Sequence, residues 1–217
     1  MSASGAGVLQ LRSVEYARNH GVRIHCRSSF TDEPGTYVVG EEETMEHPLI
    51  TAVTHSRDEA RVTLLGVPDH PGIAGRIFTA LADANVNVDM IIQNEPETEG
   101  SAADMSFTVP RADLRTARTA LDPVVAEVGI ASVAEDPAMG KVSVVGAGMK
   151  SHPGVAARVF STLGEEGINI EMISTSPIKI SCVVSADVID RAVRALHQAF
   201  ELGADQIEAE HPFGAPA

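Results

Sequence analysis

Apolar residues change their spacing in a readable order between residues 61 and 136. A strand-like apolar run gives way, at Pro71 and Gly72, to apolar residues three and four positions apart, as on one face of a helix. Alternating apolar residues then predict a second strand, and a polar loop leads to a third strand, a second helix and a fourth strand. This βαββαβ order favours an antiparallel sheet with both helices on one face. The expected strands cover 61–66, 86–93, 103–109 and 129–136, and the expected helices begin at 71 and 111.

The same pattern returns further along the chain. When the sequence is displaced by 82 positions, residues 70–90 match residues 152–172 at nine of 21 positions, and most other pairs are conservative. A strand similar to 61–66 precedes the second copy at 141–146. Self-similarity of this kind defines the structural unit before any single residue is interpreted. The chain is therefore predicted to be an α+β protein with two related ferredoxin-like domains.

The second copy lacks an obvious fourth strand. After its second helix, expected at about 187–202, the chain is polar and ends in a tail with Gly and Pro. A strand-like stretch at 49–58 has no partner in the first copy. We expect this stretch to complete the second sheet, so that the first domain is inserted into the second. The predicted domains are 60–137 for the first and 45–59 plus 138–217 for the second.

Residues 1–44 belong to neither copy. A short helix ended by Gly21, a strand at 22–30 and a turn at 31–35 indicate one αβ unit of a larger α/β domain. Such a unit alone is too small to bury both faces of a sheet. The acidic stretch at 40–48 is expected to be a linker.

Composition and charge narrow the class of protein. The 217 residues, 44% hydrophobic and 21% charged, are typical of a globular protein with a substantial core. The net charge of -14 makes nucleic acid and anionic membranes poor partners, because a phosphate surface would repel the chain. Two distant cysteines, Cys26 and Cys182, provide neither a disulfide framework nor a Cys-x-x-Cys site. The absence of a long apolar run and of a signal-peptide pattern predicts a cytoplasmic protein.

The turn before each repeated helix carries the candidate chemistry. Helix capping explains a single His-Pro-Gly turn, but both copies keep the glycine, and both are followed at the same distance by Asn-Val-Asp or Asn-Ile-Glu. Gly72 and Gly154 leave room for a small molecule near the backbone, and the free N–H groups of a first helical turn suit a carboxylate. A facing carboxylate or carbonyl group could take an ammonium group. Together these groups would bind an α-amino acid.

Residues 45–217 contain no recognisable reaction centre. The loop at 146–154 superficially resembles a phosphate-binding loop, but Met149 stands where a P-loop needs Gly, and Ser151 stands where a dinucleotide motif needs Gly. The eight His residues are scattered without metal-ligand spacing, and no nucleophile elbow occurs. No catalytic residue, metal or cofactor is predicted for this chain.

The repeated segments closely resemble the paired ACT domains in the regulatory portion of aspartokinase, particularly the actinobacterial type. The most specific are VGAGMKSHPGV at 145–155 and ISTS at 173–176, and the resemblance covers nearly the whole chain. Residues 11–36 resemble the last helix and strand of the same enzyme's amino-acid-kinase domain. In this family a separate β subunit is translated from an internal start within the gene for the catalytic α subunit. Met45 stands where such a subunit would begin, so Met1 and Met45 are both candidate starts.

The resemblance implies a regulatory function. In this family threonine and lysine inhibit the ATP-dependent phosphorylation of aspartate, the first step towards lysine, threonine and methionine. The family's N-terminal Lys-Phe-Gly-Gly catalytic stretch is absent, so ATP would be used by a catalytic α subunit, and the assembly would be a homodimer or an α2β2 complex. Two alternatives stay open: a fragment of the full-length kinase without an independent role, and an effector-binding ACT module of another amino-acid enzyme.

The resemblance also implies two effector pockets, each shared between the repeats. The threonine pocket would use Asp69, His70, Pro71, Gly72, Ile73, Ala74, Gln93, Asn169 and Ile170. The second pocket, for lysine or threonine, would use Asn87, Val88, Asp89, Val155, Ala156, Ser176 and Pro177. Helix-start N–H groups would take the α-carboxylate, and the Gln93 amide can bond a threonine hydroxyl.

The two pockets are expected to differ. Only the first turn carries an acidic residue, Asp69, which is suited to an ammonium group. Relatives carry threonine at the position of Ala156, an acidic residue at Pro177 and serine at Pro96. Because the last two departures lie close to the second pocket and the effector-binding region, the resemblance supports threonine binding more directly than lysine binding.

Overall fold

The computed structural model describes residues 5–39, 50–93, 102–146 and 154–203. Its main body is a six-stranded antiparallel sheet in the order β4-β5-β3-β6-β8-β7. The strands are β3 (Ala52–Pro68), β4 (Ile91–Gln93), β5 (Ala102–Pro110), β6 (Ser132–Val145), β7 (Met172–Ser176) and β8 (Lys179–Ser185). The helices packed on the sheet are α2 (Ile73–Asp83), α3 (Leu114–Val128), α4 (Val155–Glu165) and α5 (Ile189–Ala199). Single 3-10 turns, η3 (Arg111–Asp113) and η4 (Ala186–Val188), lead into α3 and α5.

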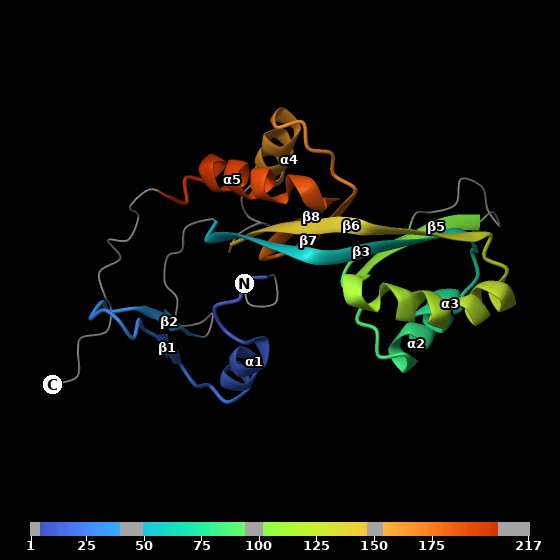
Figure 1. The fold of residues 1–217 in the computed structure, drawn as a ribbon, viewed down its shortest axis with the longest axis horizontal. Coiled ribbons are helices and arrows are strands. Elements are labelled where there is room, and N and C mark those ends of the chain that lie inside the picture. The colour runs from blue at the N-terminus through green and yellow to red at the C-terminus, as the bar shows by residue number, and fades with distance from the viewer. Residues whose placement is uncertain (1–4, 40–49, 94–101, 147–153, 204–217) are drawn as a thin grey trace.

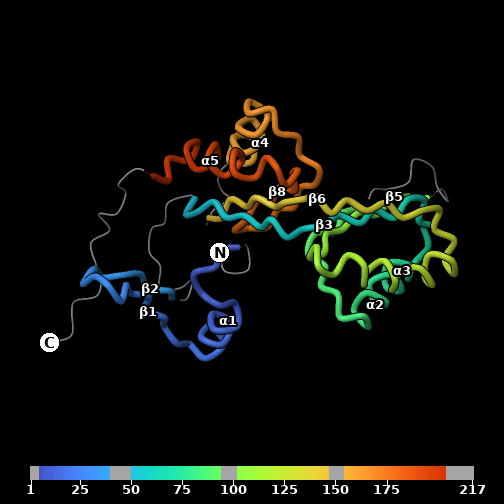
Figure 2. Tube along the Cα trace, in the orientation of Figure 1, coloured from blue at the N-terminus to red at the C-terminus, as the bar shows by residue number. Residues whose placement is uncertain are grey.

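Two long strands, β3 and β6, run through both repeats (Figure 2). The sequence predicted separate strands at 49–58 and 61–66, and at 129–136 and 141–146, but each pair is continuous. Residues 59–68 of β3 pair with β5, whereas residues 52–56 pair with residues 141–145 of β6. This register confirms that the stretch 49–58 contributes to the second sheet, and with it the inserted arrangement of two ferredoxin-like units.

The long strands divide the sheet into two halves. Half-sheet 1 consists of β4, β5, residues 59–68 of β3 and residues 132–136 of β6. Half-sheet 2 consists of β7, β8, residues 52–56 of β3 and residues 139–145 of β6. We call the place where they meet, around Glu59 and Met139, the junction.

The two pairs of helices lie on opposite sides of the long strands in Figure 1, because the sheet twists between the half-sheets. Helices α2 and α3 cover half-sheet 1, and α4 and α5 cover half-sheet 2. Since side chains alternate along a strand, each half-sheet points its apolar residues at its own helices. Phe107, Leu64 and Leu81 are fully buried in the first core, and Leu163, Ile189 and Leu196 in the second. Burial of such a side chain stabilises the fold by roughly 1.5–3 kcal/mol.

Regular strand pairing is interrupted at the junction. The register between β3 and β6 shifts on both sides of Glu59. Pro137 lies in the same interval, where a bulge tolerates a residue that has no N–H to donate. Arg111 Nη2 donates hydrogen bonds to the carbonyl oxygens of Arg57 (2.8 Å) and Met139 (3.5 Å). A side chain of the first repeat therefore satisfies backbone groups that the interrupted pairing leaves available.

The N-terminal segment forms a helix and a small hairpin. Helix α1 (Leu11–Asn19) is followed by β1 (Ile24–Cys26) and β2 (Thr36–Val38), which pair with each other. The sequence predicted the helix and the first strand and missed the second. Val8, Tyr16 and Phe30 are strongly exposed here, which is unusual for large apolar side chains and is consistent with a unit of a larger domain.

Two predicted strands are shorter than expected. The strand predicted over 22–30 is Ile24–Cys26, and the strand predicted over 86–93 is reduced to Ile91–Gln93. Val86 and Val88, just before the latter strand, pack on the first core. The Asp89 N–H still donates to the Thr108 carbonyl (3.1 Å), so the backbone follows β5 as far as the junction. The predicted linker, the second His-Pro turn at 151–153, Met45, Pro96 and the C-terminal tail lie outside the described residues.

Candidate functional site

The turn between β3 and α2 leaves its glycine open to solvent. Gly72 is the N-cap of α2 with φ 93°, a left-handed conformation natural to glycine, and a Cβ built there meets no atom within 4 Å. Its carbonyl accepts a hydrogen bond from Arg76 N–H (3.1 Å). The sequence predicted Pro71 as the first helical residue, and this is corrected: Pro71 precedes the N-cap because left-handed Gly72 separates it from Ile73. A small molecule can thus approach the backbone here without meeting a side chain of Gly72.

The second repeat has the same geometry at Gly154. This residue is the N-cap of α4 with φ 105° and open space around its Cα, and its carbonyl accepts from Arg158 N–H (2.9 Å). Val155 is buried in the second core and Ala156 packs against it. Val155 therefore offers a ligand its backbone rather than its side chain.

The other residues predicted beside the two turns are mostly exposed. Asp69, His70, Pro71 and Ala74 are exposed, whereas Ile73 packs on the first core. Gln93 is exposed at the end of edge strand β4. Ser176 ends β7 and Pro177 begins the turn to β8, across which the Ser176 hydroxyl donates weakly to the Lys179 carbonyl (3.5 Å). These residues are accessible to a ligand from solvent.

The turns and the strand segments predicted to complete the pockets lie at different ends of each half-sheet. The first turn follows Pro68, which lies seven residues beyond Arg61 on β3, about 23 Å at the rise of a strand. Helices α2 and α4, each of 11 residues and so about 16 Å long, run back from the turns towards the junction. Within one chain the structure therefore does not bring residues 69–74 together with Asn169 and Ile170, nor residues 87–89 together with Val155 and Ala156.

At the junction, Asp89 of the first repeat contacts a buried cation of the second. Lys141 Nζ lies 2.5 Å from Asp89 Oδ2 and 2.7 Å from Glu59 Oε1. The Lys141 and Glu59 side chains are 6% and 9% exposed, whereas the Asp89 side chain is 49% exposed. Burial alone would raise the pKa of the Asp89 carboxyl, but the hydrogen bond and charge of Lys141 lower it. Burial would lower the pKa of Lys141, and its two carboxylate partners raise it.

In an equivalent cluster, the basic residue belongs to the first repeat and its acidic partner to the second. Arg61 of the first repeat lies 2.7 Å from Glu171 of the second and 3.7 Å from Asp136. Asn169 Nδ2 donates to Glu171 Oε1 (2.7 Å), so the predicted ligand Asn169 is held by this cluster. The hydrogen bonds from Asn169 and Arg61 hold the pKa of the Glu171 carboxyl below its usual value.

An apolar cluster contributed by both repeats also lies at the junction. Met90 of the first repeat packs with Met139, Met172 and Val183, all of them buried. Met90 follows Asp89 and Met172 follows Glu171, so each acidic residue is anchored by a buried neighbour. This packing orders the backbone that presents the two carboxylates.

Residues 59, 61, 136, 141 and 171 were not among the predicted site residues. The signal that points to them is the repeat itself, because the basic residues Arg61 and Lys141 open equivalent strands and the acidic residues Asp89 and Glu171 occupy equivalent positions. The sequence does not indicate that each acid would pair with the base of the other repeat.

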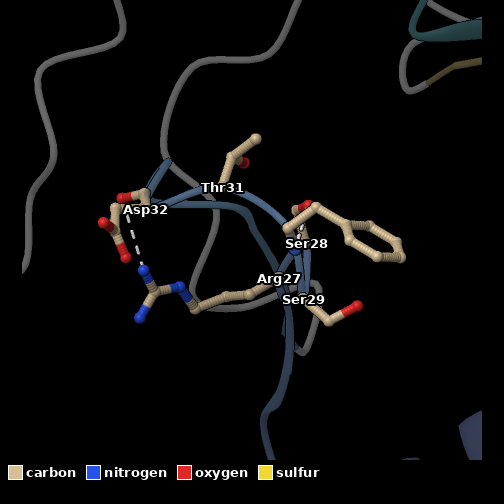
Figure 3. Close-up of a pocket in the computed structure, with 6 residues that line it drawn as sticks. Arg27, Ser28, Ser29, Thr31 and Asp32 are labelled. Carbon is tan, nitrogen blue, oxygen red and sulfur yellow. Dashed lines mark hydrogen bonds between the residues drawn. The ribbon is translucent and has the colours of Figure 1, made fainter.

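An open hollow of about 320 Å³ lies elsewhere, in the loop between β1 and β2 (Figure 3). It is lined by residues 27–32, and Arg27 closes one side by donating to the Asp32 carbonyl (3.3 Å). It contains none of the predicted site residues. Within the described ranges, no three His, Cys, Asp or Glu side chains are grouped so as to hold a metal ion, and no helix is long and apolar enough to cross a membrane.

Comparison with known proteins identifies the two repeats. Residues 61–125 and residues 142–200 each match a family described as the ACT domain. The chain is 48% identical to a chain in the crystal structure of aspartokinase alpha and beta subunits, covering 99% of that chain and 70% of this one with a TM-score of 0.65. The chain belongs to the aspartokinase family.

Two further relatives place the chain within the family. The regulatory subunit of aspartate kinase from Thermus thermophilus, in its ligand-free form, is 43% identical, with a TM-score of 0.67 over 70% of this chain and 99% of that one. The aspartokinase of Mycobacterium tuberculosis H37Rv is 49% identical over 208 residues, which are 95% of this chain and 49% of the relative. The chain thus spans about half the length of the curated relatives it matches and corresponds to the regulatory ACT region of aspartokinase.

Proposed function

We propose that this chain is the amino-acid-sensing part of an aspartate kinase, that it binds threonine and also lysine, and that binding inhibits phosphorylation of aspartate by ATP in a catalytic α subunit. The observation that carries the proposal is the repeated left-handed glycine, Gly72 and Gly154, at an open helix start in each ACT domain. A helix N-terminus with an accessible backbone suits the α-carboxylate of an amino acid. Asp69 beside the first turn supplies a negative charge for the ammonium group.

The separation of the two halves of each pocket has a consequence for assembly. Because one chain holds residues 69–74 far from Asn169 and Ile170, the threonine pocket needs Asn169 and Ile170 from a second copy. The edge strands β4 and β7 each have one neighbour among the described strands, which leaves their outer edges available for such a copy. We therefore propose a homodimer, or an α2β2 assembly with the catalytic subunit.

The domain assignment follows the strand pairing. We assign residues 1–44 to the end of an amino-acid-kinase domain, 60–137 to the first ACT domain, and 45–59 with 138–217 to the second. The ACT matches at 61–125 and 142–200 fall inside the two assigned domains, and the pairing of residues 52–56 with 141–145 supports the split of the second one.

Calorimetric titration of the purified chain tests the proposal. Threonine and lysine are added separately and together to the wild type, to Asp69→Ala and to Asp83→Ala, which removes an exposed carboxylate at the other end of α2. We expect saturable threonine binding that Asp69→Ala weakens about tenfold, the loss of roughly one charge-assisted contact, while Asp83→Ala leaves it unchanged. Absence of heat with either amino acid would refute the sensor. Binding that Asp69→Ala leaves intact would refute the pocket.

Inhibition requires a separate measurement with the catalytic subunit present. Threonine should then lower the rate of aspartate phosphorylation in the assembly with the wild-type chain and less so with Asp69→Ala. Sedimentation of the chain at several concentrations tests the second copy. A monomer that binds threonine with full affinity would exclude the shared pocket. Heat with an unrelated amino acid only would favour an ACT module of another enzyme.

A further inference from the structure

The two charged clusters at the junction cross between the repeats. Asp89, from the loop after α2, pairs with Lys141 on the first strand of the second repeat, and Glu171, from the loop after α4, pairs with Arg61 on the first strand of the first repeat. Each cluster has one cation and two carboxylates, completed by Glu59 in the first and Asp136 in the second. The same contact is thus made twice, in opposite directions.

The clusters lie on the same face of the sheet, the one that the helices leave uncovered. Val142, next to Lys141, packs in the core under α4 and α5, so Lys141 points to the face away from them. Val62, next to Arg61, packs under α2 and α3, so Arg61 points away from those helices. Ile92 lies on the Arg61 side of half-sheet 1 and packs against Met139 and Val183 on the Lys141 side of half-sheet 2, so the two sides form one face.

Between the clusters, the sheet has a natural bending point. Among the strands that the structure describes, β3 and β6 alone belong to both half-sheets, and their register shifts on both sides of Glu59. An interrupted ladder with Pro137 in it resists bending less than a regular one. The two crossed ion pairs span this point on one face, so a bend that opens that face would stretch both of them.

The geometry points to a hinge at the junction that the two crossed ion-pair clusters brace on one face of the sheet. An amino acid bound at residues 87–89 or 169–170 acts on Asp89 or Glu171, releases or strengthens one brace, and changes the angle between the half-sheets. This link to an effector rests on the proposed function, whereas the braced hinge does not. Through this hinge, binding of an amino acid to one ACT domain changes the position of the other ACT domain.

Distance measurement between two spin labels tests the brace. Labels at Thr79→Cys on α2 and Gln198→Cys on α5, both exposed and over different half-sheets, report the angle between the half-sheets in a Cys26→Ser background. The brace variant Asp89→Asn/Glu171→Gln removes the crossing carboxylates. A matched control, Asp122→Asn/Glu135→Gln, makes the same two changes around Arg118, whose partners lie 2.9 and 3.4 Å away inside half-sheet 1.

We expect a narrow distance distribution in the wild type and the control, and a broadened, shifted one in the brace variant. An unchanged distribution in the brace variant, or equal broadening in the control, would overturn the brace. If circular dichroism shows the double variant unfolded, Asp89→Asn alone, at a half-exposed side chain, must still broaden the distribution, and its failure to do so would overturn the brace too.

Addition of threonine or lysine to the labelled wild type separates the two claims. A shift of the mean distance on saturation supports coupling of the effector to the hinge. Broadening in the brace variant, together with no binding and no shift in the wild type, would uphold the hinge and refute the sensor. Saturable binding without a shift would uphold the sensor and refute the coupling.

Discussion

Replacement of Lys141 by methionine is the most direct test of how the junction is stabilised. The Lys141 ammonium is 6% exposed and lies 2.7 Å from Glu59, whose side chain is 9% exposed. Methionine preserves most of the volume and removes the charge, which leaves a buried carboxylate without its cation. Removal of one partner of a buried pair costs about 3–5 kcal/mol, because the remaining charge stays desolvated. We expect this loss in the free energy of unfolding of Lys141→Met.

Urea denaturation followed by circular dichroism measures that loss. With a slope of about 2 kcal/mol per molar urea, the midpoint should fall by roughly 2 M. The companion variant Glu59→Gln/Lys141→Met should recover most of the stability, since no buried charge is left unpaired. Arg118→Met is the matched control, because Arg118 is 42% exposed and its pairs should contribute less than about 1 kcal/mol. A loss in Lys141→Met no larger than in Arg118→Met, or no recovery in the companion variant, would refute the reasoning.

Three further predictions concern acid stability, thiol reactivity and the turn. The pKa values of the Asp89 and Glu171 carboxyls are lowered in the folded state. The stability that they contribute is therefore present above the unfolded pKa values of about 4 and is lost as the pH falls through the folded values. Urea titrations should show that Asp89→Asn/Glu171→Gln loses less free energy of unfolding on acidification than the wild type does. Burial raises the pKa of the Cys182 thiol to about 12, so a thiol reagent at pH 8 should modify one thiol fewer in the native protein than in urea, and equal counts would contradict its burial. Gly72→Ala should destabilise the chain by about 1 kcal/mol because of its positive φ, whereas Gly75→Ala inside α2, in open space, should stabilise it by about 0.5–1 kcal/mol; equal effects in thermal unfolding would contradict the left-handed turn.

Much of the fold could be read from local patterns. Helix α2 and helix α4 follow from apolar residues at helical spacing, and the glycines that begin them follow from the repeat. The strand at 49–58 could be assigned to the second sheet because the second repeat lacked a fourth strand and the first had no need of one. By contrast, the fusion of this strand with 61–66 was missed, since a register shift and a bulge depend on which strands lie alongside.

Part of the candidate site could likewise be predicted from local sequence, and part could not. The turns at Gly72 and Gly154 were predicted from the repeated His-Pro-Gly sequence, whereas the left-handed conformation of both glycines at the N-cap was not. The predicted contact of these turns with the segments at 87–89 and 169–170 is not made within one chain, because α2 and α4 separate them by their own length. A sequence motif does not give the distance in space between the two ends of a helix, so it could not show this separation.

The sequence by itself determined the repeat, the order of its elements, the apolar faces and the glycines of the turns, because each of these depends on neighbours within a few residues. Only the tertiary structure decided that two strands run through both repeats, that the apolar cluster of Met90, Met139, Met172 and Val183 joins the repeats, and that Asp89 and Glu171 each pair with the base of the other repeat. Those contacts join residues 52 and 110 positions apart along the chain. Opposite charges attract each other whatever their separation along the sequence. Only the packing of the two half-sheets therefore selects which acidic residue pairs with which basic residue.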